Sequence, residues 1–376
     1  MPAFALEPEQ EKWCDQVREL AAGRLRALAA VGEPGLINRP LVTALGDAGL
    51  LGRVFPVAGE AGVSALDLCL LRESLARECT EAETALALQG LGAYPVVQSG
   101  TRAQREEWLP EVVAGRAVPA FALSEPDAGS DAAALALSAE ADGPGRWRLS
   151  GEKCWISNAP HADFYSVFAR TGQDRGARGI TAFLVPAGRP GLSGEPLALL
   201  SPHPIGTVVF DGVPVTAADL LGEPGAGFGV AMRTLNLFRP SVGAFAVGMA
   251  QAALDAALAH AARRTAFGGP LKDLQSVSHQ LAEMATRTEA ARLLVHAAAA
   301  AYDRGAPDIA KRAAMAKLLA TETAQCVVDA AVQIHGARAL QRGHLLEHLY
   351  REVRAPRIYE GATEVQRTIV AKELYR

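Results

Sequence analysis

Arg357-Ile-Tyr-Glu360-Gly361-Ala-Thr363-Glu-Val-Gln366-Arg367 lies between two stretches with helical patterns, close to the end of the chain. Before it, Leu345 to Val353 is a mixed apolar and charged run that Pro356 ends, because proline disfavours a helical residue before it. After it, Thr363 with Gln366 has the form of a capping box. The pattern predicts a last helix from Thr363 to Tyr375.

Glu360 is therefore predicted on a short break between two helices, beside a glycine and after Ile358 and Tyr359. A carboxylate in such a place can have a raised pKa and act as a base. The alternative is an ordinary solvated glutamate in a surface loop, which is the usual fate of Glu. The remainder of the chain decides between these interpretations.

The composition indicates a globular protein of two or three domains, since 376 residues exceed the usual size of one. Hydrophobic residues make up 49% and charged residues 21%, as expected for a packed, soluble chain. The net charge of −4 gives no reason to expect a nucleic acid or an anionic membrane as partner.

The cysteines and the first residues predict a cytoplasmic protein. Five scattered cysteines without CxxC or metal-ligand spacing favour reduced thiols and no metal site. The acidic start, residues 1–11, lacks the basic end and apolar core of a signal peptide. No apolar run of membrane-spanning length is free of Gly, Pro or charge.

Three domains are predicted, in the order helices, sheet, helices. Residues 1–116 have helical patterns, and Ser64 with Asp67 and Thr101 with Gln104 are predicted helix starts. Residues 117–222 contain short apolar or alternating runs and the hairpin turn Asp142–Gly145, which predict a β-domain, a barrel or sandwich.

Residues 223–376 predict an antiparallel four-helix bundle. Three long, Ala-rich, amphipathic stretches carry this pattern, and a shorter C-terminal pair follows them; the long stretches are Leu235–Arg264, Leu274–Arg304 and Ile309–Ile334.

Two motifs of the predicted β-domain suit a polar, flat ligand. Phe121-Ala-Leu-Ser124-Glu-Pro-Asp-Ala-Gly129-Ser130-Asp131 leaves a strand through a turn that offers hydroxyls and backbone N–H groups. Gly151-Glu-Lys-Cys-Trp155-Ile-Ser157-Asn158-Ala159 places a flat indole beside a hydroxyl. The alternatives are a simple surface turn and a core tryptophan, which is the more frequent fate of Trp in a β-domain.

Together these segments resemble the acyl-CoA dehydrogenase family over nearly the full chain. The first motif is similar to the family's (A/F)-x-(L/V)-(T/S)-E-P-x-A-G-S-D, and the second to its G-x-K-x-(W/F)-I-(T/S)-N-(A/G). Further blocks follow in the family's order and spacing: Leu221–Phe228, Arg264–Gly268 with Gln275, Gln333–Gly336 and Ile358–Gly361. The succession of blocks is specific where a single one is not.

The resemblance implies a flavoenzyme with non-covalent FAD that converts an acyl-CoA to the trans-2-enoyl-CoA. Glu360 matches the catalytic base of the straight-chain, short- and medium-chain members, which takes the α-proton while flavin N5 accepts the β-hydride. Some branches carry the base on the helix near residue 238, but here Phe238 precedes Arg239. An electron-transfer flavoprotein is implied as electron acceptor, and a homotetramer built as a dimer of dimers as the assembly.

The resemblance also implies further site residues. FAD-binding positions are Phe121, Leu123, Ser124, Gly129, Ser130, Trp155, Ser157, Arg264, Phe267, Gln275, Gln333, Gly336 and Glu364. Among them, Arg264, Phe267, Gln275, Gln333 and Gly336 match residues that reach the FAD of a neighbouring subunit. Positions near the substrate are Ser130, Asn236, Arg239, Tyr359 and Gly361.

The chemistry explains these residue types. An α-proton beside a thioester is weakly acidic, so donors to the thioester oxygen must stabilise the developing enolate. In the family these donors are a flavin ribityl hydroxyl and the backbone N–H of the catalytic Glu. Exclusion of water raises the pKa of the base, and Arg264 offers a diphosphate a bidentate cation.

Some positions depart from the family pattern. Ala362 stands where a Thr is usual, and Ala337-Arg338 follows Gly336 where a second Gly is usual. Pro202–Thr207 replaces a longer loop near the substrate and electron-acceptor surfaces. Three alternatives therefore stay open: an O₂-using oxidase or monooxygenase, a desaturase of carrier-protein thioesters, and a non-catalytic binding protein on the same scaffold.

Overall fold

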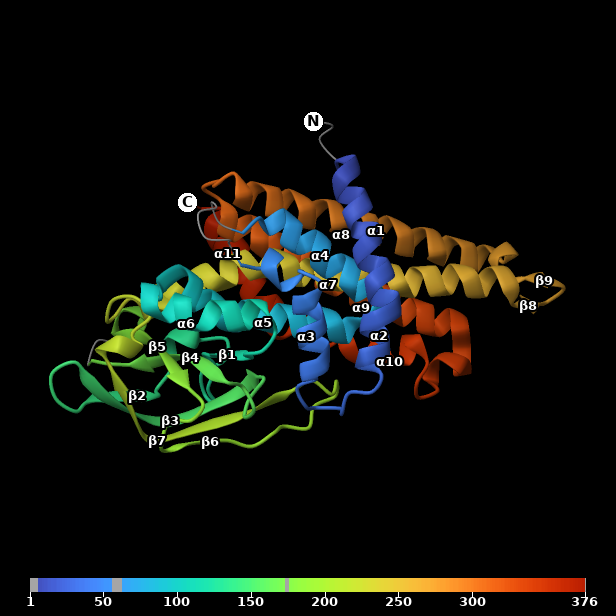
Figure 1. The fold of residues 1–376 in the computed structure, drawn as a ribbon. Coiled ribbons are helices and arrows are strands. Elements are labelled where there is room, and N and C mark those ends of the chain that lie inside the picture. Colours follow the sequence, from blue (N-terminus) through green and yellow to red (C-terminus); the bar gives the residue numbers. More distant parts are fainter. Residues whose placement is uncertain (1–5, 56–62, 173–175, 376) are drawn as a thin grey trace. The chain divides into compact units, whose positions relative to one another are not determined.

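The computed structural model describes residues 6–55, 63–172 and 176–375, and shows helices, then strands, then helices along the chain (Figure 1). This order confirms the predicted mainly α fold with a central β region. The first helical region contains α1 (Pro8–Leu20), a π-helical segment η1 (Ala21–Leu25), α2 (Arg26–Ala29), α3 (Arg39–Asp47), α4 (Ala65–Glu78), α5 (Thr80–Ser99) and α6 (Arg102–Val113). The first five residues, part of the predicted leader-free start, lie outside the described ranges.

The predicted strands are confirmed and form one seven-stranded sheet. Its order is β1-β4-β2-β3-β7-β6, and β5 pairs with β4. The strands are β1 (Pro119–Ala122), β2 (Ser138–Ala141), β3 (Arg146–Ser157), β4 (Phe164–Arg170), β5 (Ile180–Pro186), β6 (Leu192–Ser193) and β7 (Ile205–Thr216). The predicted hairpin turn at 142–145 joins β2 to β3, with the Asp142 N–H donating to the Arg146 carbonyl at 2.9 Å.

The second helical region consists of long helices and a short C-terminal pair. They are α7 (Gly227–Arg263), α8 (Gln275–Asp303), α9 (Ile309–His335), α10 (Leu345–Glu352) and α11 (Thr363–Glu373). The small β8–β9 hairpin, Thr265–Ala266 with Gly269–Pro270, joins the ends of α7 and α8 (Figure 1). Three-residue 3-10 turns precede α8 (η6, Leu271–Asp273) and α11 (η8, Ala355–Arg357).

The chain folds as two compact units. The β unit comprises Ala27–Val63 and Thr84–Leu235, and the helical unit comprises Met1–Arg26, Ser64–Glu83 and Asn236–Arg376. Three separate stretches of sequence therefore build the helical unit.

The core of the β unit consists of inward-facing side chains of the sheet. Among them are Leu149, Tyr165, Val167 and Phe183, which are all at most 1% exposed. On α6, Trp108 packs its ring 4.6 Å from that of Phe164 on β4. The close approach of α5 to β1 needs Gly92, because a Cβ there would lie 2.8 Å from Pro119.

The helical unit is held by apolar packing and by charges at helix ends. Asp303, the last residue of α8, accepts hydrogen bonds from the Ala65 N–H at 2.6 Å and the Ser64 hydroxyl at 2.8 Å. A carboxylate is favourable there because it meets the exposed N–H groups at the start of α4. On α7, a Cβ at Gly248 would lie 2.5 Å from the Glu73 carbonyl oxygen, so α7 and α4 pack at very short range.

Two features bear on the predicted setting of the chain. Within the described ranges, one helix, α7, has the length and composition that could cross a membrane, but 72% of its most apolar window is buried in the protein, as in a core helix. All five cysteines are unpaired, and only Cys326 is exposed.

All three predicted helix starts are confirmed, since α4, α6 and α11 begin at Ala65, Arg102 and Thr363, but the capping box predicted at Thr363 is wrong. Ser64 accepts from the Asp67 N–H, and Thr101 with Gln104 forms a complete capping box. At α11, Ala362 is the capping residue, and the Thr363 hydroxyl donates instead to Glu322 on α9 at 2.7 Å. A carboxylate distant in sequence thus competes successfully for this hydroxyl.

Candidate active site

Glu360 lies on the turn between η8 and α11, as predicted, in an unusual backbone conformation. Its φ is 51°, in the left-handed region that few residues other than glycine adopt, and Gly361 follows with φ 93°. A Cβ at Gly361 would lie 2.2 Å from the Gln366 Nε2. Strained residues of this kind are concentrated at functional sites, so the turn marks Glu360 as a functional candidate.

Side chains from two helices hold this turn by its carbonyl oxygens. From α9, the Lys317 ammonium donates to the Tyr359 carbonyl at 2.9 Å and the Gly361 carbonyl at 2.6 Å. From α11, the Gln366 amide also donates to the Gly361 carbonyl, at 2.8 Å. The carbonyls on both sides of Glu360 are thereby fixed.

The Glu360 carboxylate is shielded and lies among cations. Its Oε2 atom is buried and has no hydrogen-bond partner in the described part of the chain. Burial raises the pKa of Glu360, while Arg72 of α4, Lys317 of α9 and Arg239 of α7 act to lower it. The predicted raised pKa is confirmed, and its main cause is the removal of the carboxylate from water.

The predicted substrate-side residues Asn236 and Arg239 contact each other, and Arg239 also contacts the Glu360 backbone. The Arg239 guanidinium donates to the Asn236 side-chain oxygen at 3.1 Å and to the Glu360 carbonyl at 3.4 Å. Phe238 is 1% exposed, so the place of the alternative base is filled by an apolar core residue. Arg72 forms a buried ion pair with Glu83 and donates to the Ser241 hydroxyl at 2.6 Å.

In the β unit, the structure brings the two predicted flavin motifs together where β1 and β3 end. The Cys154 N–H donates to the Ser124 carbonyl at 3.0 Å, and the Asn158 amide donates to the Pro119 carbonyl at 2.8 Å. Between them, the fully buried Lys153 ammonium donates to the Leu123 carbonyl at 2.9 Å and to the Glu125 carboxylate at 2.7 Å. Glu125 also accepts from two backbone N–H groups, those of Ala136 and Leu137.

The surface of these motifs fits the flat ring of a flavin. Trp155 is 50% exposed and has φ 57°, so the interpretation as a core tryptophan is wrong. Ser130 is exposed, and the position a Cβ would take at Gly129 meets only open space. Phe121, Ser124 and Ser157 are half-buried, and Leu123 is buried. An open indole face beside hydroxyl groups is the arrangement that a polar aromatic ring requires.

The other predicted FAD residues lie at one end of the helical unit. Arg264 and Phe267 are on the β8–β9 hairpin, where Phe267 is 94% exposed at φ 54°. Gln275 begins α8, and Gln333 and Gly336 lie at the end of α9. His260 of α7 stacks on His335 of α9 at 4.1 Å between ring centroids, which brings these ends together.

Glu364 lies in the first turn of α11. Its exposed side chain on α11 makes an ion pair of 3.9 Å with Arg367. The structure therefore gives it no shielding of the kind that Glu360 has.

Sequence reasoning missed Lys317 as a residue of this site. It lies in an Ala-rich amphipathic stretch, where lysine usually occupies the solvated face, yet it is fully buried. The signal available in the sequence was the pair of small apolar neighbours, Ala316 and Ala320, which favour an internal face. The structure shows that both are fully buried.

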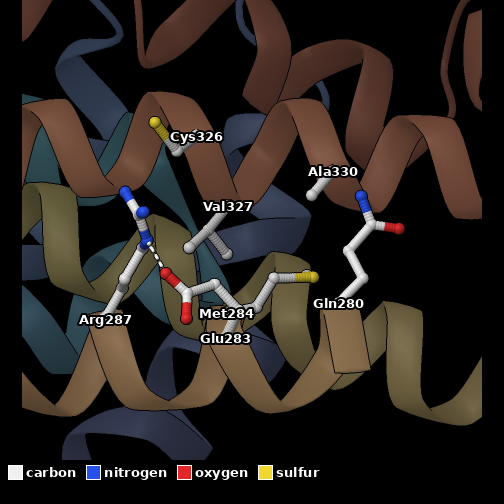
Figure 2. A pocket seen from close by; sticks show the side chains of 7 residues that line it. All are labelled: Gln280, Glu283, Met284, Arg287, Cys326, Val327 and Ala330. Carbon is white, nitrogen blue, oxygen red and sulfur yellow. Dashed lines mark hydrogen bonds and ion pairs between the residues drawn. The ribbon is translucent and has the colours of Figure 1, made fainter. Parts of the chain in front are cut away.

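A hollow lies between α8 and α9 (Figure 2). It has a volume of 220 Å³, and the Glu283–Arg287 ion pair of 2.5 Å and Cys326 are on its wall. None of the predicted site residues lines it.

The fold and these sites define a class: a flavin-dependent dehydrogenase with a helical, β and helical chain order. Models of the N-terminal, middle and C-terminal domains of acyl-CoA dehydrogenase match residues 7–116, 120–213 and 225–375. The chain belongs to the acyl-CoA dehydrogenase family of oxidoreductases.

Relatives are similar over nearly the whole length. The short-chain specific acyl-CoA dehydrogenase of Bos taurus mitochondria is 39% identical, with 98% of this chain and 91% of the relative covered. The solved butyryl-CoA dehydrogenase of Megasphaera elsdenii is 35% identical with a TM-score of 0.92, covering 99% of this chain and 100% of the other. The solved FAD complex of PigA is 26% identical with a TM-score of 0.92, covering 99% of both.

Proposed function

We propose that this chain is an FAD-dependent dehydrogenase that forms the trans-2-enoyl-CoA from a short-chain acyl-CoA, with Glu360 as the base. The observation that carries the proposal is the shielded, unpartnered Oε2 of Glu360 on a strained turn. FAD, when bound, supplies the acceptor for the two electrons that leave with the β-hydrogen. The chain itself must bind the thioester, orient its α-carbon and take the proton.

Glu360 suits proton removal because its environment does not stabilise the carboxylate by hydrogen bonds. A carboxylate that accepts several hydrogen bonds is a weak base, whereas burial raises the pKa of Glu360 toward that of an acidified α-proton. The three neighbouring cations act to lower the pKa of Glu360 and so oppose part of the effect of burial.

The backbone of the same turn offers a donor for the thioester. In the described ranges, the Glu360 N–H has no acceptor within the protein. A donor without an internal partner is available to the carbonyl oxygen on which negative charge develops. Lys317 and Gln366 fix the adjoining peptide groups, so this N–H is held in place before substrate binds.

FAD binding is proposed at the motifs of the β unit and at the exposed hairpin of the helical unit. Phe121, Leu123, Ser124, Gly129, Ser130, Trp155 and Ser157 are assigned to the ring and its chain. Arg264, Phe267, Gln275, Gln333 and Gly336 are assigned to the adenosine diphosphate end of a neighbouring subunit's FAD, in a cytoplasmic dimer of dimers. The nearly full exposure of Phe267 supports this, since large exposed apolar side chains commonly serve interfaces.

A panel of acyl-CoA substrates tests the function and its substrate range. Under anaerobic conditions, butyryl-CoA is expected to bleach the flavin fastest, and dodecanoyl-CoA at least about tenfold more slowly. The reason is that each methylene group that does not fit the pocket weakens binding of the transition state. Electron-transfer flavoprotein is then expected to restore the yellow colour much faster than air. Rapid reoxidation by air contradicts the dehydrogenase, and bleaching only by a carrier-protein thioester contradicts the CoA substrate.

Arg264→Ala tests the proposed contribution to a neighbour's cofactor. Loss of a cationic partner for the diphosphate is expected to lower FAD affinity roughly a hundredfold. FAD and assembly are then linked, so the variant forms a weaker dimer without added FAD. Titration with FAD and sedimentation with and without it measure both effects. Arg263→Ala, one residue earlier and also exposed, is the control; equal affinities in the two variants contradict the assignment.

A further inference from the structure

We propose that Lys317 is a positioning residue for Glu360: its ammonium holds the two carbonyls that flank the base, and its charge sets the pH range in which the base works. The inference rests on the proposed function of Glu360. Its evidence is separate, because it comes from contacts of α9 with the backbone of the turn.

The geometry is that of a clamp. Lys317 is fully buried, and its Nζ lies 2.9 Å from the Tyr359 oxygen and 2.6 Å from the Gly361 oxygen. A single ammonium thus binds the carbonyl oxygens of the residues before and after Glu360. A residue with φ 51° costs energy to hold, so the clamp supports the conformation that presents Glu360.

The partners of Lys317 differ from those of the other buried lysine. Lys153 makes an ion pair with Glu125 at 2.7 Å, whereas Lys317 has no carboxylate within ion-pair distance among the residues described. A buried ammonium bound only to neutral carbonyls is unfavourable, so its retention needs a compensating charge nearby. Glu360 supplies that charge through space.

The charges of Lys317 and Glu360 influence each other's pKa. Burial lowers the pKa of Lys317 to about 8, Glu360 and Glu322 act to raise it, and Arg239 acts to lower it. Glu360 is faced by Arg72, Lys317 and Arg239, all of which act to lower its pKa against the effect of burial.

The directions of these pKa shifts predict an acid limb and an alkaline limb in the profile of activity against pH. Activity rises with pH as Glu360 loses its proton, and falls above about pH 8 as Lys317 loses its own and the clamp weakens. Lys317→Met removes a positive charge near the base. The pKa of Glu360 therefore increases, and the acid limb is expected to move up by about one pH unit.

The test is single-turnover flavin reduction by butyryl-CoA between pH 5.5 and 9, with the FAD-loaded enzyme. Lys317→Met is expected to shift the acid limb, lose the alkaline limb and react roughly tenfold more slowly at pH 7. Lys317→Arg keeps the charge at all these pH values, so it is expected to retain the acid limb and move the alkaline limb beyond pH 9. Lys372→Met, on the exposed face of α11, is the matched control and keeps the wild-type profile.

Amide hydrogen exchange of the peptide that spans 358–362 gives a readout independent of turnover. After division by the intrinsic exchange rate at each pH, faster exchange is expected in Lys317→Met at pH 7 and in the wild type above pH 8, but not in Lys317→Arg. A purely structural lysine would loosen the peptide without moving the acid limb, so slow turnover with an unmoved limb overturns the inference. If Lys317→Met does not fold, an alkaline limb that stays near pH 8 in Lys317→Arg overturns it. Failure of the proposed function is seen separately, as wild-type activity of Glu360→Gln.

Discussion

In the Glu360→Gln variant, butyryl-CoA is expected to reduce the flavin at least about 10³-fold more slowly than in the wild type. The variant is expected to keep its fold and its bound FAD. The amide has nearly the shape of the carboxyl but does not accept the α-proton. Lys317, Gln366 and Arg239 bind backbone carbonyls of the turn, so these contacts survive the change. Stopped-flow absorbance of the flavin measures the rate, and the ratio of flavin to protein absorbance measures the cofactor.

Two variants distinguish Glu360 from other carboxylates. Glu364→Gln alters an exposed side chain of the next helix, and Asp131→Asn alters the exposed last residue of the first flavin motif. Both are expected to react within a few-fold of the wild type. A wild-type rate in Glu360→Gln, joined by a large loss in one of these two, would move the base to that residue.

Lys153→Met is expected to lower the free energy of unfolding of the β unit by about 3–5 kcal/mol, since removal of one partner leaves a buried charge unpaired. Lys153 is fully buried and Glu125 is 6% exposed, so solvent cannot replace the ammonium. Weaker FAD binding is expected as well, because Lys153 also holds the Leu123 carbonyl. Urea unfolding followed by tryptophan fluorescence reports on this unit, which contains Trp108, Trp147 and Trp155.

The double variant Glu125→Gln with Lys153→Met separates charge from packing. A neutral amide needs no buried counter-ion, and part of the lost stability is expected to return, by about 1–2 kcal/mol. Strictly additive losses would show that the two side chains act through packing and not as an ion pair. Lys272→Met, on the exposed 3-10 turn before α8, is the control for removal of a lysine charge.

Local patterns were sufficient for most elements of the fold. The apolar period of the three long helices is a property of adjacent residues, so the sequence predicts the ends of α7, α8 and α9 to within one residue, apart from the start of α7. The start of α7 is the exception: it begins at Gly227, eight residues before the predicted Leu235, because a glycine-rich start hides the helical pattern.

Features that depend on distant partners were beyond local patterns. Thr363 has the local form of a cap, but Glu322 binds its hydroxyl from another helix. Trp155 is of a residue type that is usually buried in a β-domain, but its backbone has a φ of 57° and its side chain is exposed. Lys317 has the spacing of a surface lysine, and only the return of the chain at Tyr359 and Gly361 gives its ammonium acceptors. For Thr363 and Lys317 the deciding partners lie at least 41 residues away in the sequence, and for Trp155 the deciding feature is its backbone conformation.

The division of the helical unit among three stretches of sequence has a consequence for biosynthesis. The β unit ends at Leu235, so its residues are all available before the last third of the chain leaves the ribosome. The helical unit cannot form until Asn236–Arg376 has been synthesised, although its segments Met1–Arg26 and Ser64–Glu83 are made early. During that interval the apolar face of α4, with Leu68, Leu71 and Leu75 all at most 1% exposed in the finished protein, has no partner from α8. Nascent chains halted before α8 are therefore expected to be the species that chaperones bind and that aggregate, and Glu360, the proposed base, is among the last residues to be added.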